Sequence, residues 1–155
     1  MIIIPSGKPK IWDKSPDIGS ISANQAYTGT FHKLCQAYAK EFDSDYLILS
    51  PYYGFLKPDD FISETYDVRF TLKGVNQNTI QLAELKKQWQ QLNRPETTLT
   101  ILGGKKFQAL LREIVGPTLL LNFPLAEAGG IGIMQKFLKD AVATKTELPI
   151  IKKWA

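Results

Sequence analysis

The sequence predicts a single α/β domain over residues 1–155, with a mostly parallel, helix-flanked central sheet. Three observations predict this fold. Short apolar runs alternate with stretches of helical spacing about a dozen residues long, as parallel strands joined by helical crossovers require. The apolar runs at 2–4, 46–49 and 119–121 are continuous, which is typical of strands covered on both faces. The length is that of one domain, and no linker or internal repeat divides it.

The first half of the chain contributes two strands and one helix. Residues 1–5 are predicted as a buried strand, and a polar loop rich in Lys, Pro, Ser and Gly follows at 6–24. Between 27 and 42 the apolar residues recur at helical spacing. Residues 46–49 form the second strand, and residues 66–72 alternate enough to be an extended segment.

The second half repeats this alternation, with glycine and proline between the elements. The predicted elements are a helix at 78–92, a strand at 97–102, a helix at 105–115, a strand at 118–123 and a helix at 133–143. Asn78 or Thr79 is the candidate N-cap of the first of these helices. The tail at 148–155 is apolar and basic, and it either packs as an edge strand or lies loose.

Composition restricts the classes of function. A net charge of +4 and a pI near 9.1 fit a polyanionic partner such as DNA, because clustered cations gain affinity by releasing counterions from phosphates. No apolar run approaches the roughly 20 residues that span a bilayer, and residues 1–4 lack the length and basic leader of a signal peptide. We therefore expect a cytoplasmic protein. The single cysteine, Cys35, excludes an internal disulfide and a cysteine-based zinc cluster.

Each predicted strand ends in a turn that contains serine or glycine. Because the carboxyl ends of parallel strands meet at one edge of a sheet, these turns should offer backbone amides to a common ligand. We assign ligand binding to the turn residues Ser6, Gly7, Ser50, Gly54, Gly103, Gly104, Gly130 and Gly132. The alternative is that the glycines only end strands and helices. No glycine turn has the spacing of a dinucleotide or Walker motif, so we predict no cofactor.

Four carboxylates, Asp59, Asp60, Glu64 and Asp67, follow the second strand within nine positions. If two of them approach each other, one pKa rises and a general acid stands beside a general base. A carboxylate can also orient water and stabilise the cationic sugar that forms when a glycosidic bond breaks. We assign this catalytic role to Asp59 and Asp67, and we expect Asp60 to cap a turn. The spacing matches no metal-binding loop, so no metal site is predicted.

Cations and aromatic residues lie near the same turns. Lys8 is counted with the catalytic residues, because a lysine at a strand end serves a phosphate, a carboxylate or an imine-forming reaction. Lys10 is its neighbour in the first loop. Tyr27, Tyr53 and Tyr66 supply aromatic surface that can stack or hydrogen-bond an unpaired base while the cations hold backbone phosphates.

The other nucleophile and base candidates are interpreted as structural. His32 is the only histidine, and it lies inside a predicted helix, away from the strand ends. Cys35 is on the apolar face of that helix, where a cysteine packs as a small hydrophobic residue. Ser50 is followed by proline and lacks the elbow motif of a Ser-His-Asp hydrolase.

The motifs at 5–10, 26–31 and 49–56, with Tyr66-Asp67 downstream, resemble a bacterial uncharacterised-domain family. That family is similar in pattern to the YaaA proteins and, more distantly, to the core domain of archaeosine synthase. The glycine turns at 102–104 and 124–132 extend the resemblance over most of the chain. Two positions depart from the pattern: Ser6 stands where the family often has cysteine, and Pro51 where a small residue is usual.

The resemblance implies work on nucleic acid. YaaA proteins are linked to DNA binding under peroxide stress, and the archaeosine relatives modify a tRNA base. We therefore predict a base-processing enzyme that hydrolyses an N-glycosidic bond in DNA, with the base turned out of the stack. Two alternatives remain open: a DNA-binding protein without catalysis that protects against stress, and an enzyme for free nucleobases or nucleotides.

Overall fold

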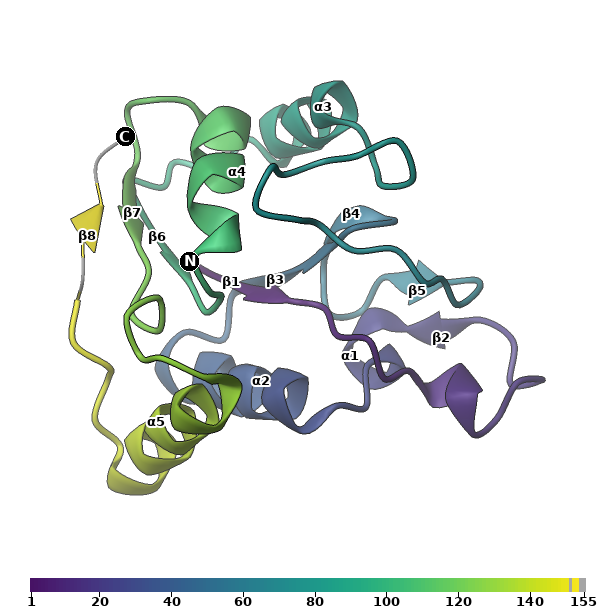
Figure 1. Cartoon of the computed structure of the whole chain (residues 1–155), viewed down its shortest axis with the longest axis horizontal. Helices are drawn as coiled ribbons and strands as arrows, with labels where there is room; N and C mark the ends of the chain where they lie inside the picture. The colour runs from purple at the N-terminus through teal and green to yellow at the C-terminus, as the bar shows by residue number, and fades with distance from the viewer. Residues whose placement is uncertain (151, 154–155) are drawn as a thin grey trace.

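The computed structural model describes residues 1–150 and 152–153. Its larger sheet has six strands: β1 (Ile2–Pro5), β3 (Tyr46–Ser50), β4 (Gly54–Leu56), β6 (Thr98–Ile101), β7 (Leu120–Asn122) and β8 (Lys152–Lys153). The strand order is β4-β3-β1-β6-β7-β8, with β3, β1, β6 and β7 parallel and the two edge strands antiparallel (Figure 1). The predicted α/β fold with a mostly parallel sheet is confirmed.

Helices cover both faces of this sheet (Figure 1). The two on one face are α2 (Thr30–Phe42) and α5 (Ile131–Thr144), and the two on the other are α3 (Leu82–Leu92) and α4 (Lys106–Val115). Three short elements lie outside these layers: the 3₁₀ turn η1 (Ile11–Asp13), the helix α1 (Ala23–Ala26) and a two-stranded sheet of β2 (Ile21–Ser22) and β5 (Phe61–Ile62).

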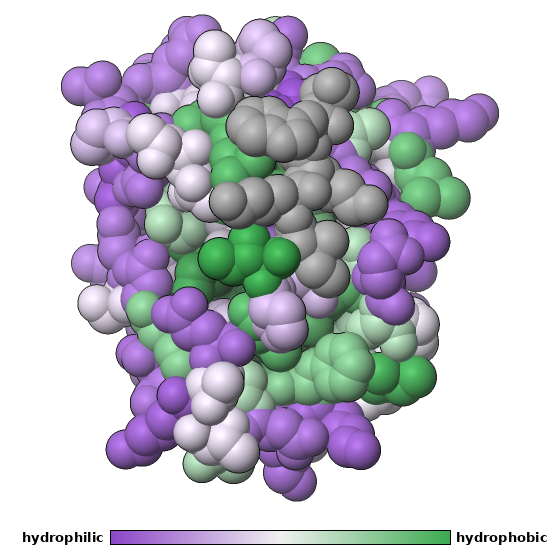
Figure 2. Space-filling model, turned by 90° about the vertical axis from the view of Figure 1, so that its left-hand side faces the viewer, coloured by the Kyte–Doolittle hydropathy of each residue, from purple (hydrophilic) through white to green (hydrophobic). Residues whose placement is uncertain are grey.

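The continuous apolar strands feed two separate cores. Along β1, Ile2 and Ile4 pack toward α2 and α5, while Ile3 packs toward α3 and α4, because successive strand side chains point to opposite faces. Figure 2 views the molecule from the β7–β8 edge and shows hydrophilic residues around the margin with apolar residues gathered toward the centre. No helix in the described part of the chain is both long and apolar enough to cross a membrane.

The chain reverses its winding direction between β1 and β6. From β1 it crosses through α2 to β3 on one side, and from β6 it crosses through α4 to β7 on the other side and over the opposite face. Neighbouring strands whose connections leave in opposite directions open a crevice at their carboxyl ends, which is where ligands bind in open α/β sheets. The topology therefore places a binding crevice at the ends of β1 and β6.

The structure differs from the prediction at several local points. Helix α3 begins at Leu82 with Gln81 as its N-cap, so the predicted cap at Asn78 or Thr79 is wrong. The polar loop contains η1 and β2, and helix α2 begins at Thr30 rather than residue 27 because Tyr27 forms an isolated bridge with Lys10. The hairpin strand β4 was expected as loop. In the tail, Lys152–Lys153 pair with β7, which confirms the edge-strand alternative there, and positions 151, 154 and 155 lie outside the described residues.

Candidate functional site

A cavity of about 800 Å³ opens at the carboxyl ends of β1 and β6, as the topology predicts. The loop after β1 and the Gly103-Gly104 turn after β6 form its base. The amino ends of α2, α4 and α5 and the segment from Tyr66 to Leu72 form its sides. The volume is within the range of small-molecule sites.

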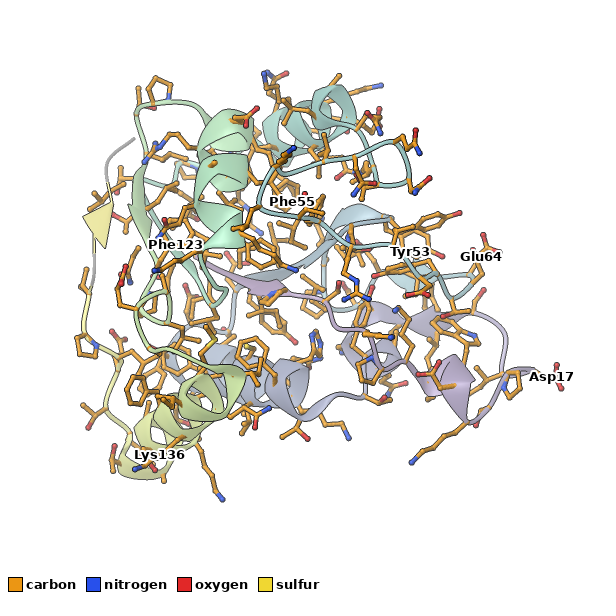
Figure 3. The ribbon with its side chains drawn as sticks, viewed as in Figure 1. Asp17, Tyr53, Phe55, Glu64, Phe123 and Lys136 are labelled. Carbon is orange, nitrogen blue, oxygen red and sulfur yellow. The ribbon has the colours of Figure 1, made fainter. Side chains whose placement is uncertain are left out.

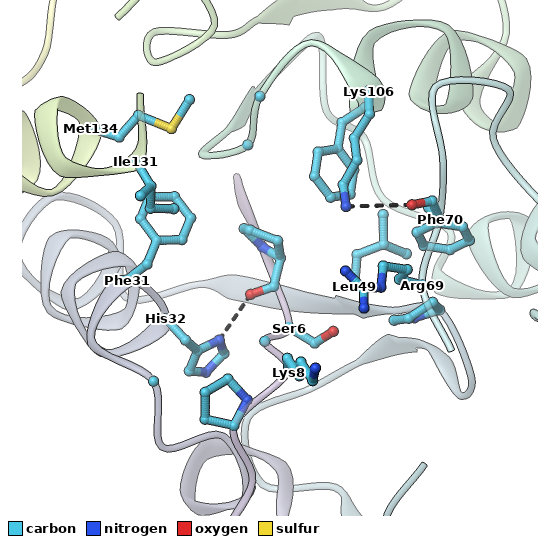
Figure 4. Close-up of a pocket in the computed structure, with 18 of the residues that line it drawn as sticks. Ser6, Lys8, Phe31, His32, Leu49, Arg69, Phe70, Lys106, Ile131 and Met134 are labelled. Carbon is cyan, nitrogen blue, oxygen red and sulfur yellow. Dashed lines mark hydrogen bonds between the residues drawn. The ribbon is translucent and has the colours of Figure 1, made fainter. Parts of the chain in front are cut away.

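Two walls of different chemistry face each other across this cavity (Figure 4). Phe31 from α2 and Ile131 and Met134 from α5 form an apolar wall. On the opposite side lie Arg69 and Lys106, with the apolar Leu49 and Phe70 beside them, and we call the pair of cations the cationic wall. Ser6, Lys8 and His32 lie between the two walls. The cavity can therefore hold a ligand that is flat and apolar at one end and anionic at the other.

A network of hydroxyl groups lies behind the cavity at Tyr66. Ser50 Oγ donates to the Tyr66 hydroxyl at 2.8 Å, and the Tyr27 hydroxyl lies 2.6 Å from the same oxygen. Burial is the largest influence on the Tyr66 pKa and raises it, whereas the hydrogen bonds with Ser50, Ser6 and Tyr27 lower it in part. The phenol stays protonated at neutral pH, and its oxygen joins the ends of β1 and β3.

Lys10 adds a cation to this network. Its Nζ lies 4.3 Å from the centre of the Tyr66 ring and donates to the Lys8 carbonyl at 3.0 Å. Desolvation lowers the Lys10 pKa, and the charges of Asp13 and Asp67 oppose that shift. Lys10 is only 4% exposed, so it offers a ligand little surface. Its hydrogen bond to the Lys8 carbonyl stabilises the first loop.

His32 lies beside the carboxyl end of β1, not away from the strand ends as the sequence indicated. Its Nδ1 is 2.8 Å from the Pro5 carbonyl oxygen, which can only accept, so Nδ1 carries the proton. Nε2 then accepts from Gln36 Nε2 at 2.7 Å. Burial lowers the His32 pKa to about 4. Both ring nitrogens are used within the fold, as the structural interpretation of His32 predicted.

Positive charge dominates the cavity. Lys8, Lys10, Arg69, Lys105 and Lys106 line it, against one carboxylate, Asp67, among the lining residues that the structure describes. Lys105 lies 3.9 Å from Glu127. Desolvation lowers the pKa of Lys106, and the charge of Arg69 lowers it further. The described residues hold no group of three or more His, Cys, Asp or Glu side chains that could bind a metal ion.

The structure brings about half of the predicted site residues to the cavity. Those that line it are Ser6, Gly7, Lys8, Lys10, Tyr66, Asp67, Gly103 and Gly104. Those outside the lining are Tyr27, Ser50, Tyr53, Gly54, Asp59, Gly130 and Gly132. Two of the four predicted turns, at 6–8 and 103–105, therefore line the cavity with their assigned residues, and the turn after β3 reaches it only through Pro51. The turn at 128–130 serves instead as the start of α5, with Gly130 as its N-cap.

The residues outside the lining have structural contacts of their own. Tyr27 is 2% exposed, so it has no free face for a base. The Tyr53 hydroxyl donates to the Glu64 carbonyl at 2.7 Å, and Figure 3 shows the two residues side by side. Asp59 is exposed and does not meet Asp67 in the cavity, so the structure does not form the predicted carboxylate pair there. Asp60 accepts from the Lys57 amide at 2.8 Å, which confirms its capping role.

Several lining residues were not assigned to the site from the sequence. Lys105 and Lys106 directly follow the Gly103-Gly104 turn, so their position at a strand end could have assigned them to the site. Arg69 stands alone in an irregular segment and had no such signal. Phe31 and Met134 read as ordinary core positions of helices, and only the tertiary packing turns them toward the cavity.

Three comparisons with known proteins bear on identity. Residues 14–140 match the model of a family of unknown function, DUF6884. The chain is 41% identical over 150 residues to the uncharacterized protein YfjM of Bacillus subtilis (strain 168), which covers 96% of this chain and 98% of YfjM. No solved structure matches the chain. A bacterial family without assigned function was expected from the motifs, and the comparisons carry no link to YaaA.

Proposed function

The chain belongs to the DUF6884 family of unknown function, and we propose that it processes a nucleobase in DNA by hydrolysing an N-glycosidic bond. One observation carries the proposal: the apolar wall of Phe31, Ile131 and Met134 faces the cationic wall of Arg69 and Lys106 across a single cavity. A base has an apolar face and is joined through its sugar to phosphates. A nucleotide unit therefore matches the two walls.

The substrate base must leave the DNA stack to reach this cavity, as enzymes that act on bases require. The apolar wall would contact the extruded base, and the surrounding cations would hold the backbone. The motifs that resemble those of YaaA proteins include cavity residues, among them Ser6, Gly7, Lys8 and Tyr66. We propose that this resemblance reflects a shared class of substrate, which also implies a cytoplasmic location.

Asp67 is the cavity's candidate for the carboxylate that the reaction needs. Its charge would stabilise the oxocarbenium-like sugar and orient the attacking water. The water oxygen then bonds to C1′ and gives a proton to the Asp67 carboxylate, the C1′–N bond breaks, and the base leaves with a proton that Lys8 donates. Lys8 lines the cavity and is exposed, so its ammonium is available to a ligand.

The test is mass spectrometry of bases released when the purified chain meets several DNAs, including damaged DNA and modified phage genomes. We expect one base to appear with the wild-type chain and its rate of release to fall at least 100-fold in Asp67→Asn. Asp17→Asn, which removes an exposed carboxylate outside the cavity lining, is the matched control and should release the base at the wild-type rate.

Two results would change this proposal. Release that depends on Asp59 and not on Asp67 would move the chemistry to the exposed loop. No release from any DNA, with salt-dependent DNA binding retained, would support the second candidate: a DNA-binding protein without catalysis. The excess of cations over carboxylates in the cavity favours that candidate over an enzyme for free bases, which carry no phosphate.

A further inference from the structure

The cationic wall holds two charges that repel each other. Lys106 is half-buried at the start of α4, and Arg69 approaches it from the segment that follows Tyr66. Desolvation and the charge of Arg69 both lower the Lys106 pKa. Among the described residues, the ion pairs involve other side chains, so no carboxylate neutralises either cation. Two unneutralised cations in one cavity favour an anionic ligand.

Hydrogen bonds attach the backbone that carries Arg69 to its surroundings and to Lys106. Lys106 Nζ donates to the Phe70 carbonyl at 3.4 Å, which uses one of its three N–H groups and leaves two for a ligand. Asn76 Nδ2 donates to the Arg69 carbonyl at 3.1 Å and fixes the backbone there. The segment that carries Arg69 is thus attached to α4 through Lys106, and Arg69 and Lys106 line the same side of the cavity.

The backbone beside Lys106 has the same polarity. Gly103, Gly104 and Lys105 line the cavity directly before α4, a helix of ten residues. Amides at the start of a helix favour an anion. In α4 those of Phe107 and Gln108 donate to the carbonyls of Gly104 and Lys105, so the amides that concern a ligand are those of 103–106. Gly104 lacks a side chain that would cover them. The helix end and the two cations therefore act on the same part of the cavity.

We propose that Arg69 and Lys106, with the backbone at 103–106, form a phosphate-binding subsite. Arg69 would supply the planar fork that matches two phosphate oxygens, and Lys106 the compact charge. The subsite deepens the proposed function, on which it rests for its ligand: it assigns the cationic wall to a phosphate that flanks the extruded base, so the substrate is a nucleotide unit and not a free base. Lys8, which lies between the two walls, is left for the reacting centre.

The test is titration of the ¹⁵N-labelled full chain with inorganic phosphate, followed by amide NMR shifts at pH 7. We expect saturable shifts at Gly103, Gly104 and Lys106. Arg69→Gln and Lys106→Gln should each weaken phosphate binding about tenfold, which is the effect of losing one charge-assisted hydrogen bond. Lys106→Arg should bind within about threefold of the wild type, because it keeps the charge.

Lys139→Gln is the matched control, since it removes one exposed lysine from α5 outside the cavity lining. It should bind phosphate as the wild type does. Wild-type phosphate shifts that are absent, or that survive unchanged in both Arg69→Gln and Lys106→Gln, would overturn the subsite. The melting temperature of each variant identifies one that has failed to fold, and in that case Lys106→Met replaces Lys106→Gln.

The subsite and the base chemistry fail separately in this design. Phosphate binding that depends on Arg69 and Lys106 without any base release keeps the subsite and removes the glycosylase. Base release from DNA with phosphate binding unaffected by either substitution keeps the enzyme and removes the subsite. If inorganic phosphate inhibits base release by the wild type and not by Lys106→Gln, the phosphate subsite and the base-release activity belong to one substrate site.

Discussion

Ser50 Oγ lies 2.8 Å from the hydroxyl of Tyr66. Ser50 Oγ also accepts hydrogen bonds from the amides of Tyr52 and Tyr53, at 3.1 and 3.0 Å. One fully buried hydroxyl therefore ends β3, shapes the turn that follows it and holds the tyrosine behind the cavity. The Tyr66 ring also stacks on Tyr52 with centres 5.1 Å apart. These contacts within the protein connect the loops around the cavity to one another.

Replacing Ser50 should lower stability more than a surface substitution. Ser50→Ala removes the acceptor of two amides and one donor to Tyr66, and groups left unsatisfied in a buried site cost about 2 kcal/mol in the free energy of unfolding. Urea unfolding measures the change. Ser63→Ala, at an exposed position, is the control and should stay within about 0.5 kcal/mol. An equal effect of the two substitutions would contradict the role of the network.

Stability should depend on pH through His32. The His32 pKa is lowered by burial from 6.5 to about 4, so the unfolded chain binds a proton at pH values where the folded chain does not. The stabilisation is complete above pH 6.5 and is lost as the pH falls toward 4. Between pH 7.5 and 4.5 this loss is about 2.5 kcal/mol. Urea unfolding at both pH values should give a smaller loss for His32→Gln; an identical loss would show that carboxylates account for it.

Two glycines that looked alike in the sequence should respond oppositely to alanine. A Cβ at Gly103 would overlap the ring of Phe107, which is buried in the core, so Gly103→Ala should cost about 1–3 kcal/mol. A Cβ at Gly132 meets nothing within 4 Å, and the residue is the second of α5. Gly132→Ala should therefore stabilise the chain by about 0.5 kcal/mol. Thermal unfolding of the two variants tests both signs, and destabilisation by Gly132→Ala would contradict the geometry.

DNA affinity should carry a salt dependence to which Arg69 contributes. Because Arg69 is assigned to a backbone phosphate, Arg69→Gln should reduce the slope of log K against log salt by about 0.9 on duplex or 0.7 on single strands. Fluorescence anisotropy at several salt concentrations measures this slope. Lys139→Gln should leave the slope unchanged, since Lys139 lies outside the cavity lining. A wild-type slope in Arg69→Gln would remove Arg69 from the DNA interface.

The sequence was sufficient for the sheet and for the edge where the cavity lies, because continuous apolar runs and strand-end turns are local patterns. It was not sufficient for the direction of individual side chains. Tyr27 and Asp59 lie close in the chain to cavity residues, yet one is buried and the other exposed away from the lining. Arg69 sits in a segment without regular structure, so no periodicity placed it.

Gly54, predicted to contact a ligand, leaves room for the side chain of Gln88 instead. Gln88 reaches from α3 to the free side of β4, where its Oε1 accepts from the Phe55 amide at 2.9 Å and its Nε2 donates to the Tyr53 carbonyl at 3.0 Å. A side chain at Gly54 would overlap Gln88. A single side-chain amide thus takes the place of the next strand at Tyr53 and Phe55, and it occupies the backbone groups there with which the strand of a second molecule would pair.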